Sequence, residues 1–308
     1  MTLYGKQPIQ KRRFSQDKDA GQGQFRPGEQ KPQYGQQQPQ QQYRARGPPP
    51  QFQQMGAPQE RQQGGYERRE GFGGQREFSE HRRGFPPQIR PHAAFAGVFT
   101  NGREIFTKNL VPGIKVYGEQ LLKSGEVEYR KWNPYRSKLG AVITQNAKNV
   151  PIKADSKVLY LGAASGTTVS HVSDIAKDGI VYAVEFAPRV FRELIEMSRL
   201  RKNVIPILAD ANHPELYSGI IGKVDFVFQD IAQPNQTEIF IKNCKMFLQH
   251  GGQGILILKA RSVDVTVAPQ EIFRRSAGEL SKGGLDVLET VDINRFEIDH
   301  ASFFVKMR

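Results

Sequence analysis

The chain has 308 residues, a formal net charge of +13 at pH 7 and a single cysteine, Cys244. One cysteine excludes a disulfide framework and a Cys-based zinc site within the chain, and it is typical of a protein from a reducing compartment. No apolar run approaches the roughly 18 residues that a membrane helix needs, and the N-terminus lacks the apolar segment of a secretory signal.

Residues 1–92 are predicted to be a disordered tail. They hold runs of Gln with much Gly and Pro, and Leu3, Ile9 and Ile89 are their only Leu, Ile or Val residues. So few aliphatic side chains cannot form a core that offsets the entropy of an ordered chain. The tail carries 16 Lys and Arg against 8 Asp and Glu, which with its aromatic side chains suits non-specific contact with RNA. The alternative is a solubilising or phase-separating extension.

Residues 93–132 are predicted to form a small β subdomain. Within them, residues 97–107 have the pattern of a hairpin, because Asn101-Gly102 suits a type I′ turn between flanks of high β-propensity. Residues 126–130 alternate as a further strand. Trp132, the only tryptophan, is expected to anchor this subdomain against the main domain through its large apolar ring.

The main domain is predicted over residues 133–308 and begins with a helix. Asn133 is expected to cap this helix and Pro134 to start it, since asparagine is a good N-cap and proline is tolerated at the first helical position. The helix is expected to reach about residue 147, with Lys138 in its second turn.

Strand and helix patterns alternate through the rest of the chain. Strands are predicted at 157–161, 180–184, 204–208, 224–229 and 254–258, helices at about 167–177, 188–201, 234–249 and 268–281, and two final strands at about 285–291 and 301–307. Near-continuous apolar strands indicate burial on both faces, hence a largely parallel sheet covered by helices. A closing hairpin on such a sheet is usual in class I S-adenosylmethionine-dependent methyltransferases. The predicted fold class is therefore α/β, with a Rossmann-like, mostly parallel seven-stranded sheet.

A small-residue turn is the most informative motif. The first strand of the sheet runs into the segment 162–166 (Gly-Ala-Ala-Ser-Gly) and then directly into a helix, an arrangement that brings the backbone close to a nucleotide-like cofactor. Glu185 ends the next strand, where the dinucleotide-binding pattern puts a carboxylate against a ribose. Asp210 suits an adenine amino group, and Asp230 suits the sulfonium side or the catalytic centre. S-adenosylmethionine is the cofactor that these strand ends fit.

Several blocks of the sequence closely resemble the fibrillarin family, in the same order along the chain. They are residues 108–113, 116–119, 132–139, 158–173, 181–186 and 230–234. The resemblance runs from about residue 92 to the C-terminus. The tail departs from it, because eukaryotic fibrillarins usually carry dense Arg-Gly-Gly repeats, whereas this tail is rich in Gln and has few Arg-Gly pairs.

The resemblance implies the catalytic subunit of box C/D small nucleolar ribonucleoproteins, in the nucleus and nucleolus. Its implied reaction is guide-RNA-directed 2′-O-methylation of ribose in ribosomal RNA, with S-adenosylmethionine as methyl donor. Implied partners are the guide RNA, the ribosomal RNA, a Nop-family scaffold protein and a kink-turn-binding protein. The expected cofactor contacts are Gly162, Ala163, Thr167, Thr168, Glu185, Phe186, Asp210, Ala211, Asp230, Ile231, Ala232 and Gln233. The family's catalytic constellation falls on Lys138, Asp230, Lys259 and His300.

The chemistry gives these residue types distinct roles. A ribose hydroxyl is a poor nucleophile near neutral pH, so it needs a base and a setting that tolerates developing negative charge. We expect Lys259 to take the proton, Lys138 to stabilise the oxygen and Asp230 to orient the lysines. His300 is expected to be a supporting hydrogen-bond partner.

Purely structural roles are the alternatives for single residues. Asp230 could cap the following helix, Lys138 could be an ordinary surface lysine, and His300 could be structural. His171 is expected on a helix surface or at a cap. Two other functions compete with RNA methylation. One is methylation of a protein, at a histone glutamine; the other is a catalytically silent RNA-binding scaffold.

Overall fold

The computed structural model describes residues 88–308 except 146 and 149, and these residues belong to one compact unit. Of the tail predicted over residues 1–92, residues 1–87 lie outside the described residues. Among the residues that are described, no helix is long and apolar enough to span a membrane.

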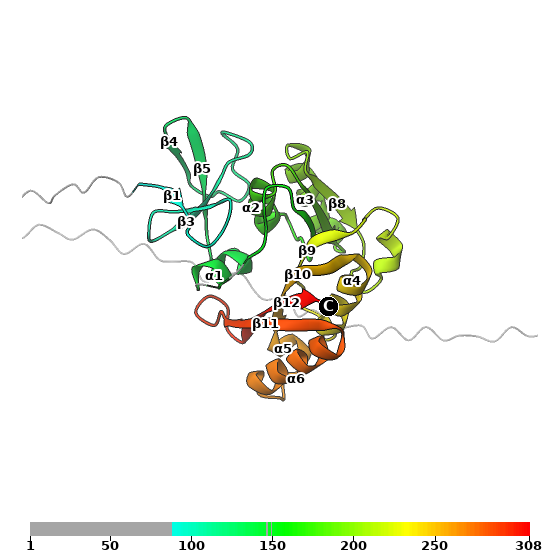
Figure 1. Ribbon diagram of the computed structural model, residues 1–308. Coiled ribbons are helices and arrows are strands. Elements are labelled where there is room, and N and C mark those ends of the chain that lie inside the picture. The colour runs from blue at the N-terminus through cyan, green and yellow to red at the C-terminus, as the bar shows by residue number, and fades with distance from the viewer. Residues whose placement is uncertain (1–87, 146, 149) are drawn as a thin grey trace, which may run out of the picture. The chain divides into compact units, whose positions relative to one another are not determined.

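The first part of the described chain is a five-stranded antiparallel sheet in the order β1-β2-β3-β5-β4 (Figure 1). Its strands are β1 (Arg90–Pro91), β2 (Val98–Thr100), β3 (Ile105–Lys108), β4 (Leu121–Ser124) and β5 (Val127–Trp132). The predicted hairpin is confirmed as the antiparallel pair β2 and β3. The further predicted strand is β5, which pairs with both β3 and β4.

The turn of this hairpin is not of type I′, and that prediction was wrong. A type I′ turn needs positive φ at both central residues, whereas Gly102 has φ +88° and Asn101 does not have a positive φ. Asn101 instead accepts two hydrogen bonds through Oδ1, from the N–H of Arg103 (2.9 Å) and of Glu104 (2.8 Å). Such a local side-chain bond stabilises an Asx turn and a longer loop.

The first helix, α1 (Lys138–Thr144), begins later than predicted. Ser137 is its N-cap, and its Oγ accepts the N–H of Gly140 at 3.1 Å. Asn133 closes a separate turn ahead of the helix, because its Oδ1 accepts the N–H two residues on, at 2.9 Å. Asn133 and Ser137 are both suited to capping a helix, and Ser137 caps α1. Lys138 is therefore the first residue of the helix rather than part of its second turn.

The rest of the described chain contains the predicted seven-stranded sheet, in the order β11-β12-β10-β9-β6-β7-β8. The strands are β6 (Lys157–Leu161), β7 (Ile180–Glu185), β8 (Val204–Leu208), β9 (Val224–Asp230), β10 (Leu248–Lys259), β11 (Leu285–Asp292) and β12 (His300–Met307). The five strands from β6 to β10 are parallel, and β12 pairs antiparallel with both β10 and β11.

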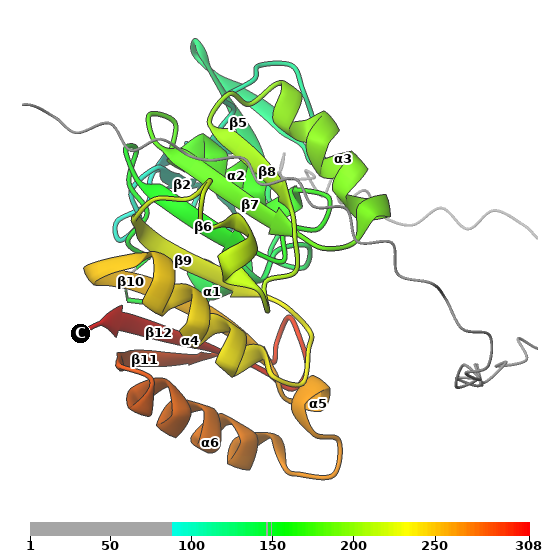
Figure 2. The same cartoon turned by 90° about the vertical axis from the view of Figure 1, so that its right-hand side faces the viewer.

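Helices cover both faces of this sheet (Figure 2). They are α2 (Thr167–Ile175), α3 (Pro188–Arg199), α4 (Gln236–Phe247), α5 (Ala260–Val263) and α6 (Pro269–Lys282), with a 3₁₀ turn η1 (Pro214–Tyr217). In β6, Val158 and Tyr160 belong to the core shared with α1, α2 and α3, whereas Leu159 and Leu161 belong to the core shared with α4 and α6. This alternation explains the continuous apolar strands, because each strand is buried on both sides.

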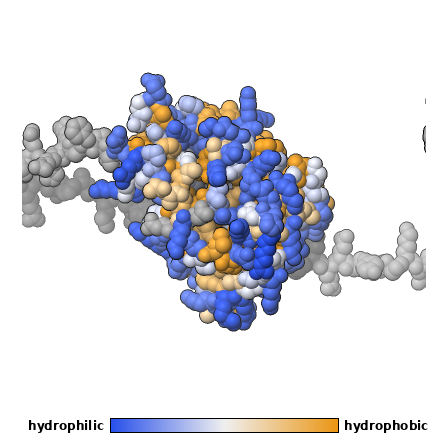
Figure 3. All heavy atoms as spheres, viewed as in Figure 1, coloured by the Kyte–Doolittle hydropathy of each residue, from blue (hydrophilic) through white to orange (hydrophobic). Residues whose placement is uncertain are grey.

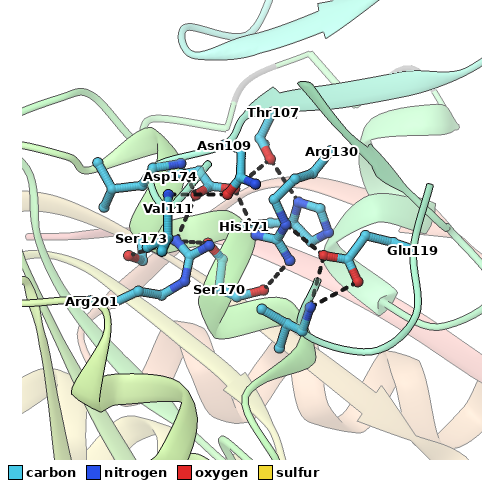
Figure 4. Close-up of polar contacts among 12 residues, drawn as sticks. Thr107, Asn109, Val111, Glu119, Arg130, Ser170, His171, Ser173, Asp174 and Arg201 are labelled. Carbon is cyan, nitrogen blue, oxygen red and sulfur yellow. Dashed lines mark hydrogen bonds and ion pairs between the residues drawn. The ribbon is translucent and has the colours of Figure 1, made fainter. Parts of the chain in front are cut away.

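A cluster of buried charges joins the small sheet to α2 (Figure 4). Asp174 of α2 accepts hydrogen bonds from Arg130 Nη1 (2.7 Å), Arg201 Nη1 (2.6 Å) and Thr107 Oγ1 (2.7 Å). Arg130 also donates from Nε to Glu119, at 2.6 Å. None of the four charged side chains is more than 2% exposed. The two guanidinium groups and two carboxylates therefore compensate one another out of water.

His171 lies in this cluster, so its prediction as a surface or cap residue was wrong. It is fully buried, with Nδ1 2.8 Å from Thr107 Oγ1 and Nε2 2.8 Å from the Tyr117 hydroxyl. Its ring stacks on Trp132 with centroids 4.7 Å apart. Trp132 is 1% exposed and anchors the small sheet against α2, as predicted.

We expect His171 to make the fold less stable in mild acid. Burial, with the positive charges of Arg130 and Arg201, lowers the pKa of His171 well below the ordinary value. The unfolded chain binds this proton near about pH 6.5, and the folded chain binds it only at lower pH. The contribution to stability is therefore complete above about pH 6.5 and is lost as the pH falls toward the folded-state pKa, by up to about 1.4 kcal/mol per pH unit.

The measurement is the free energy of unfolding in urea, between about pH 7.5 and about pH 5.5. The variant His171→Gln should unfold more easily at neutral pH but show a flatter dependence on pH. His250→Gln, which changes an exposed histidine, should keep the slope of the unchanged protein. An equal slope in His171→Gln would contradict the assignment.

Candidate functional site

The turn after β6 is shaped by a very close backbone contact. Gly162 has φ +81°, and a Cβ at this position would lie 2.3 Å from the carbonyl oxygen of Asp230. The N–H groups of Gly162 and Ala163 both donate to Val184 O at 3.0 Å. Only glycine fits this conformation and this approach, so the end of β6 lies directly against the end of β9.

A cavity of about 270 Å³ opens at this end of the sheet. It is lined by Gly162, Ala164, Val184, Glu185, Phe186, Ala209, Asp210, Ala211, Asp230, Ile231, Ala232 and Gln233. Nine of these twelve residues belong to the predicted cofactor set. A larger groove of about 700 Å³ between α4 and α6 contains none of them, so the smaller cavity is the better candidate site.

Two acidic side chains in the cavity are held by backbone N–H groups. Glu185 is 8% exposed; its Oε2 accepts from Ala164 N (2.9 Å) and its Oε1 from Ala187 N (2.8 Å). Asp210 accepts from Asn212 N through Oδ1, at 2.9 Å. A carboxylate has about four acceptor positions, so each of these keeps free acceptors for hydroxyl or amino groups of a ligand.

A lysine–aspartate pair lies at the edge of the same cavity. Lys138 Nζ is 3.0 Å from Asp230 Oδ2, and the two side chains are 23% and 27% exposed. Asp230 is the last residue of β9, next to the cavity floor, whereas Lys138 comes from the start of α1. Residues far apart in the sequence thus form one charged pair at the strand ends.

The other two predicted catalytic residues face each other in the neighbouring strands. Lys259 ends β10 and His300 begins β12, and the two are paired in the antiparallel register. His300 is 5% exposed, and its Nδ1–H donates to Ile298 O at 2.7 Å. Burial, then the positive charge of Lys138, lowers the pKa of His300. At neutral pH the imidazole is therefore neutral, with Nε2 free to accept a hydrogen bond.

Comparison with known proteins identifies the family. The model of the family described as Fibrillarin matches residues 89–308, well over half of the chain. The chain belongs to the fibrillarin family.

Several relatives of this fibrillarin-family chain are similar over the same region. A fibrillarin-like rRNA/tRNA 2′-O-methyltransferase from Methanocaldococcus jannaschii is 54% identical over 201 residues, which are 65% of this chain and 87% of the relative. The structure of Aeropyrum pernix fibrillarin in complex with natively bound S-adenosyl-L-methionine is 43% identical, with a TM-score of 0.66 over 71% of this chain and 97% of that one. The structure of a fibrillarin/Nop5p complex is 40% identical, with a TM-score of 0.64 over 69% and 98%.

Three residues of the predicted cofactor set do not line the cavity. Ala163 belongs to the turn itself and is buried. Thr167 lines a separate groove beside α3. Thr168 is 8% exposed and donates through Oγ1 to Ser137 Oγ at 3.0 Å. Thr168 thus connects the helix after the glycine turn to the cap of α1, the helix that begins with Lys138.

Gln236 is a residue of the candidate site that the sequence did not indicate. It is fully buried at the start of α4. Its Oε1 accepts from Lys259 N (3.0 Å) and its Nε2 donates to Lys259 O (3.1 Å). This amide fixes the backbone of Lys259 at the end of its strand. Only the tertiary structure reveals the contact, because a glutamine at a helix start has no distinctive sequence signal.

Proposed function

We propose that this protein is an S-adenosylmethionine-dependent methyltransferase that modifies the 2′-hydroxyl of ribose in ribosomal RNA, guided by RNA, as the catalytic subunit of a box C/D ribonucleoprotein. The observation that carries the proposal is the Lys138–Asp230 pair at the edge of the cavity, in a chain of the fibrillarin family. A cation beside the acceptor position suits an oxygen that becomes negatively charged.

The residues of the cavity fit the cofactor. Glu185 has free acceptors for two ribose hydroxyls, and Asp210 beside Ala211 has free acceptors for an adenine amino group. Gly162 lets the end of β6 lie against the end of β9, where any side chain would collide with Asp230 O. When bound, S-adenosylmethionine supplies an electrophilic methyl group on a positively charged sulfur.

The residues around the acceptor have separate tasks in this proposal. Lys259 takes the proton that the ribose hydroxyl loses, and Lys138 stabilises the oxygen as negative charge develops. Asp230 holds Lys138 in place through the ion pair. The neutral ring of His300 supports the group as a hydrogen-bond acceptor. The oxygen would exchange its bond to hydrogen for a bond to the methyl carbon. The proton would go to the amine of Lys259 in its neutral form, and the carbon–sulfur bond that breaks would leave an uncharged thioether, so atoms and charge balance.

The proposed partners follow from the reaction and the family. The guide RNA supplies target choice by base pairing, and a Nop-family scaffold and a kink-turn-binding protein assemble the particle. A fibrillarin/Nop5p complex among the similar structures supports the scaffold. The nucleolus is the proposed location, because ribosomal RNA is the substrate. In the proposed domain organisation, residues 1–92 add RNA contacts to the small β subdomain (93–132) and the methyltransferase domain (133–308).

The experiment replaces the native gene by an Asp230→Ala form and maps ribose methylation of ribosomal RNA site by site. Methylation should be lost at many guided sites while the particles still assemble, because the variant removes the partner of Lys138. Asp286→Ala changes an exposed aspartate on β11 and should leave the map unchanged. An unchanged map in Asp230→Ala, with the variant present in assembled particles, would refute RNA methylation by this site.

A further inference from the structure

Two aromatic side chains stand out by their exposure. In the described part of the chain, Tyr135 (63%) and Phe186 (62%) are the mostly exposed aromatic residues. Phe186 lines the candidate cofactor cavity. Tyr135 lies three residues before Lys138, outside that cavity. A large ring kept in water beside a reaction centre is more informative than one exposed aliphatic side chain, because rings offer flat faces for binding.

Tyr135 does not stand alone. Its ring packs edge-on against Phe296, with centroids 5.1 Å apart and an interplanar angle of 65°. Phe296 is half-buried against the core and lies in the turn before β12, four residues ahead of His300. The aromatic pair therefore bridges the two segments that lead into Lys138 and His300. The face of the molecule in Figure 3 is mixed, with hydrophobic residues in its middle surrounded mostly by hydrophilic ones.

The turn that carries Phe296 is held by its own contacts. Asn294 Oδ1 accepts the N–H of Asp299 at 2.8 Å, and Asp299 O accepts the N–H of Ala260 at 3.0 Å. The carboxylate of Asp299 pairs with Arg261 at 2.9 Å. The aromatic pair is thus pre-organised, which lowers the entropic cost of binding a ligand there.

Each aromatic residue has an arginine next to it in the sequence. Arg136 follows Tyr135, is exposed and lines the groove that contains Tyr117 and Glu193, whereas the Arg295 guanidinium lies 5.7 Å from the centre of the Phe296 ring. Within residues 88–308, as far as they are described, neither arginine forms an ion pair with a carboxylate. Guanidinium groups of this kind bind phosphate oxygens well. An aromatic face with arginines nearby is the combination that receives bases or sugars together with their phosphates.

We propose that Tyr135 and Phe296, with Arg136 and Arg295, form an RNA subsite for the nucleotide next to the acceptor ribose. The sugar or base of that nucleotide packs on Tyr135, and the two guanidinium groups bind its flanking phosphates. The subsite holds the RNA strand so that the acceptor hydroxyl lies at Lys138. This inference rests on the proposed function and adds the residues that position the substrate.

The kinetic test uses the particle assembled from the full chain, its protein partners and guide RNA. Tyr135→Ala should raise the KM for substrate RNA by about 5- to 140-fold, the range for loss of one stacked base. Tyr135→Phe and Tyr135→Trp should remain near the unchanged protein, because both retain an aromatic face. Affinity for S-adenosylmethionine should stay unchanged in all three. Leu216→Ala, a change at a 72% exposed residue on η1, serves as the matched control.

A photochemical test observes the contact directly and does not depend on methyl transfer. Substrate RNA with 4-thiouridine next to the target nucleotide should cross-link to the peptide that contains Tyr135, and the cross-link should disappear in Tyr135→Ala. A cross-link elsewhere, together with an unchanged KM in Tyr135→Ala, would overturn the subsite while leaving RNA methylation intact. Weaker assembly with the scaffold protein at unchanged KM would assign this surface to a protein and also overturn it. A particle with the unsubstituted protein that cross-links at Tyr135 but does not methylate RNA would refute the proposed function and leave the subsite intact.

Discussion

Replacement of Lys259 by alanine is expected to slow methyl transfer by about 10²- to 10⁴-fold, the usual contribution of a positioned proton acceptor. Lys259 does not line the candidate cofactor cavity, so the affinity for S-adenosylmethionine should be nearly unchanged. Its backbone is fixed by Gln236, and these main-chain bonds survive the substitution. Single-turnover methylation of guided RNA, with the cofactor affinity measured separately, tests both parts of the expectation.

The matched control is Lys157→Ala, an exposed lysine at the opposite, amino end of β6. It should methylate RNA at the normal rate. A Lys259→Ala protein that loses cofactor binding together with turnover would show that this lysine has a structural or cofactor-binding role. Full activity in Lys259→Ala would remove it from the mechanism.

Asp174→Asn should destabilise the fold by about 3–5 kcal/mol, the usual cost of breaking a buried ion pair on one side. Asp174 faces two buried guanidinium groups, at 2.7 Å and 2.6 Å. The amide leaves Arg201 with no carboxylate partner and Arg130 with Glu119 alone. The free energy of unfolding in urea measures the loss.

Asp178→Asn provides the comparison for this substitution. Asp178 follows the same helix but is 60% exposed, and its ion pair with Lys177 lies in water. A change at such a position is expected to stay within about 0.5 kcal/mol. Equal stability losses in the two variants would contradict the role given to the buried cluster.

The alternation of strands and helices in the main domain could be predicted because burial on both faces leaves an unbroken apolar run. Residues 255–258 show this pattern, and all four are at most 1% exposed. The strand β4 (Leu121–Ser124) was missed for the opposite reason. Its residues are half-buried or exposed at the edge of the small sheet, so they have no periodic apolar signal.

The environment of His171 could not be predicted from the sequence. Its own helix is amphipathic, and nothing local indicates that β3 and β5 cover its outer side. The contacts that bury it come from Thr107, Tyr117 and Trp132, all distant in the chain. Long-range packing of this kind decides burial, whereas sequence patterns report mainly local periodicity.

The residues of the candidate site were easier to predict than the residues that hold them in place. Strand ends in an open parallel sheet converge at one edge, so Glu185, Asp210 and Asp230 could be placed together before the fold was known. Thr168 bonds to Ser137 instead of lining the cavity, because the first turn of α2 packs against α1. The role of Gln236 was missed because its side-chain amide bonds to the backbone of Lys259. Only the fold brings these two residues together.

The position of β12 has a consequence for biosynthesis. This strand is made after β11 yet lies between β10 and β11, and its first residue, His300, completes the group at the strand ends. A nascent chain that ends before residue 300 has an unpaired, strongly apolar β10 edge, which is the kind of surface that chaperones protect. The ribosome therefore finishes one of the interior strands of the sheet late, and the proposed catalytic group is incomplete until that strand has been inserted.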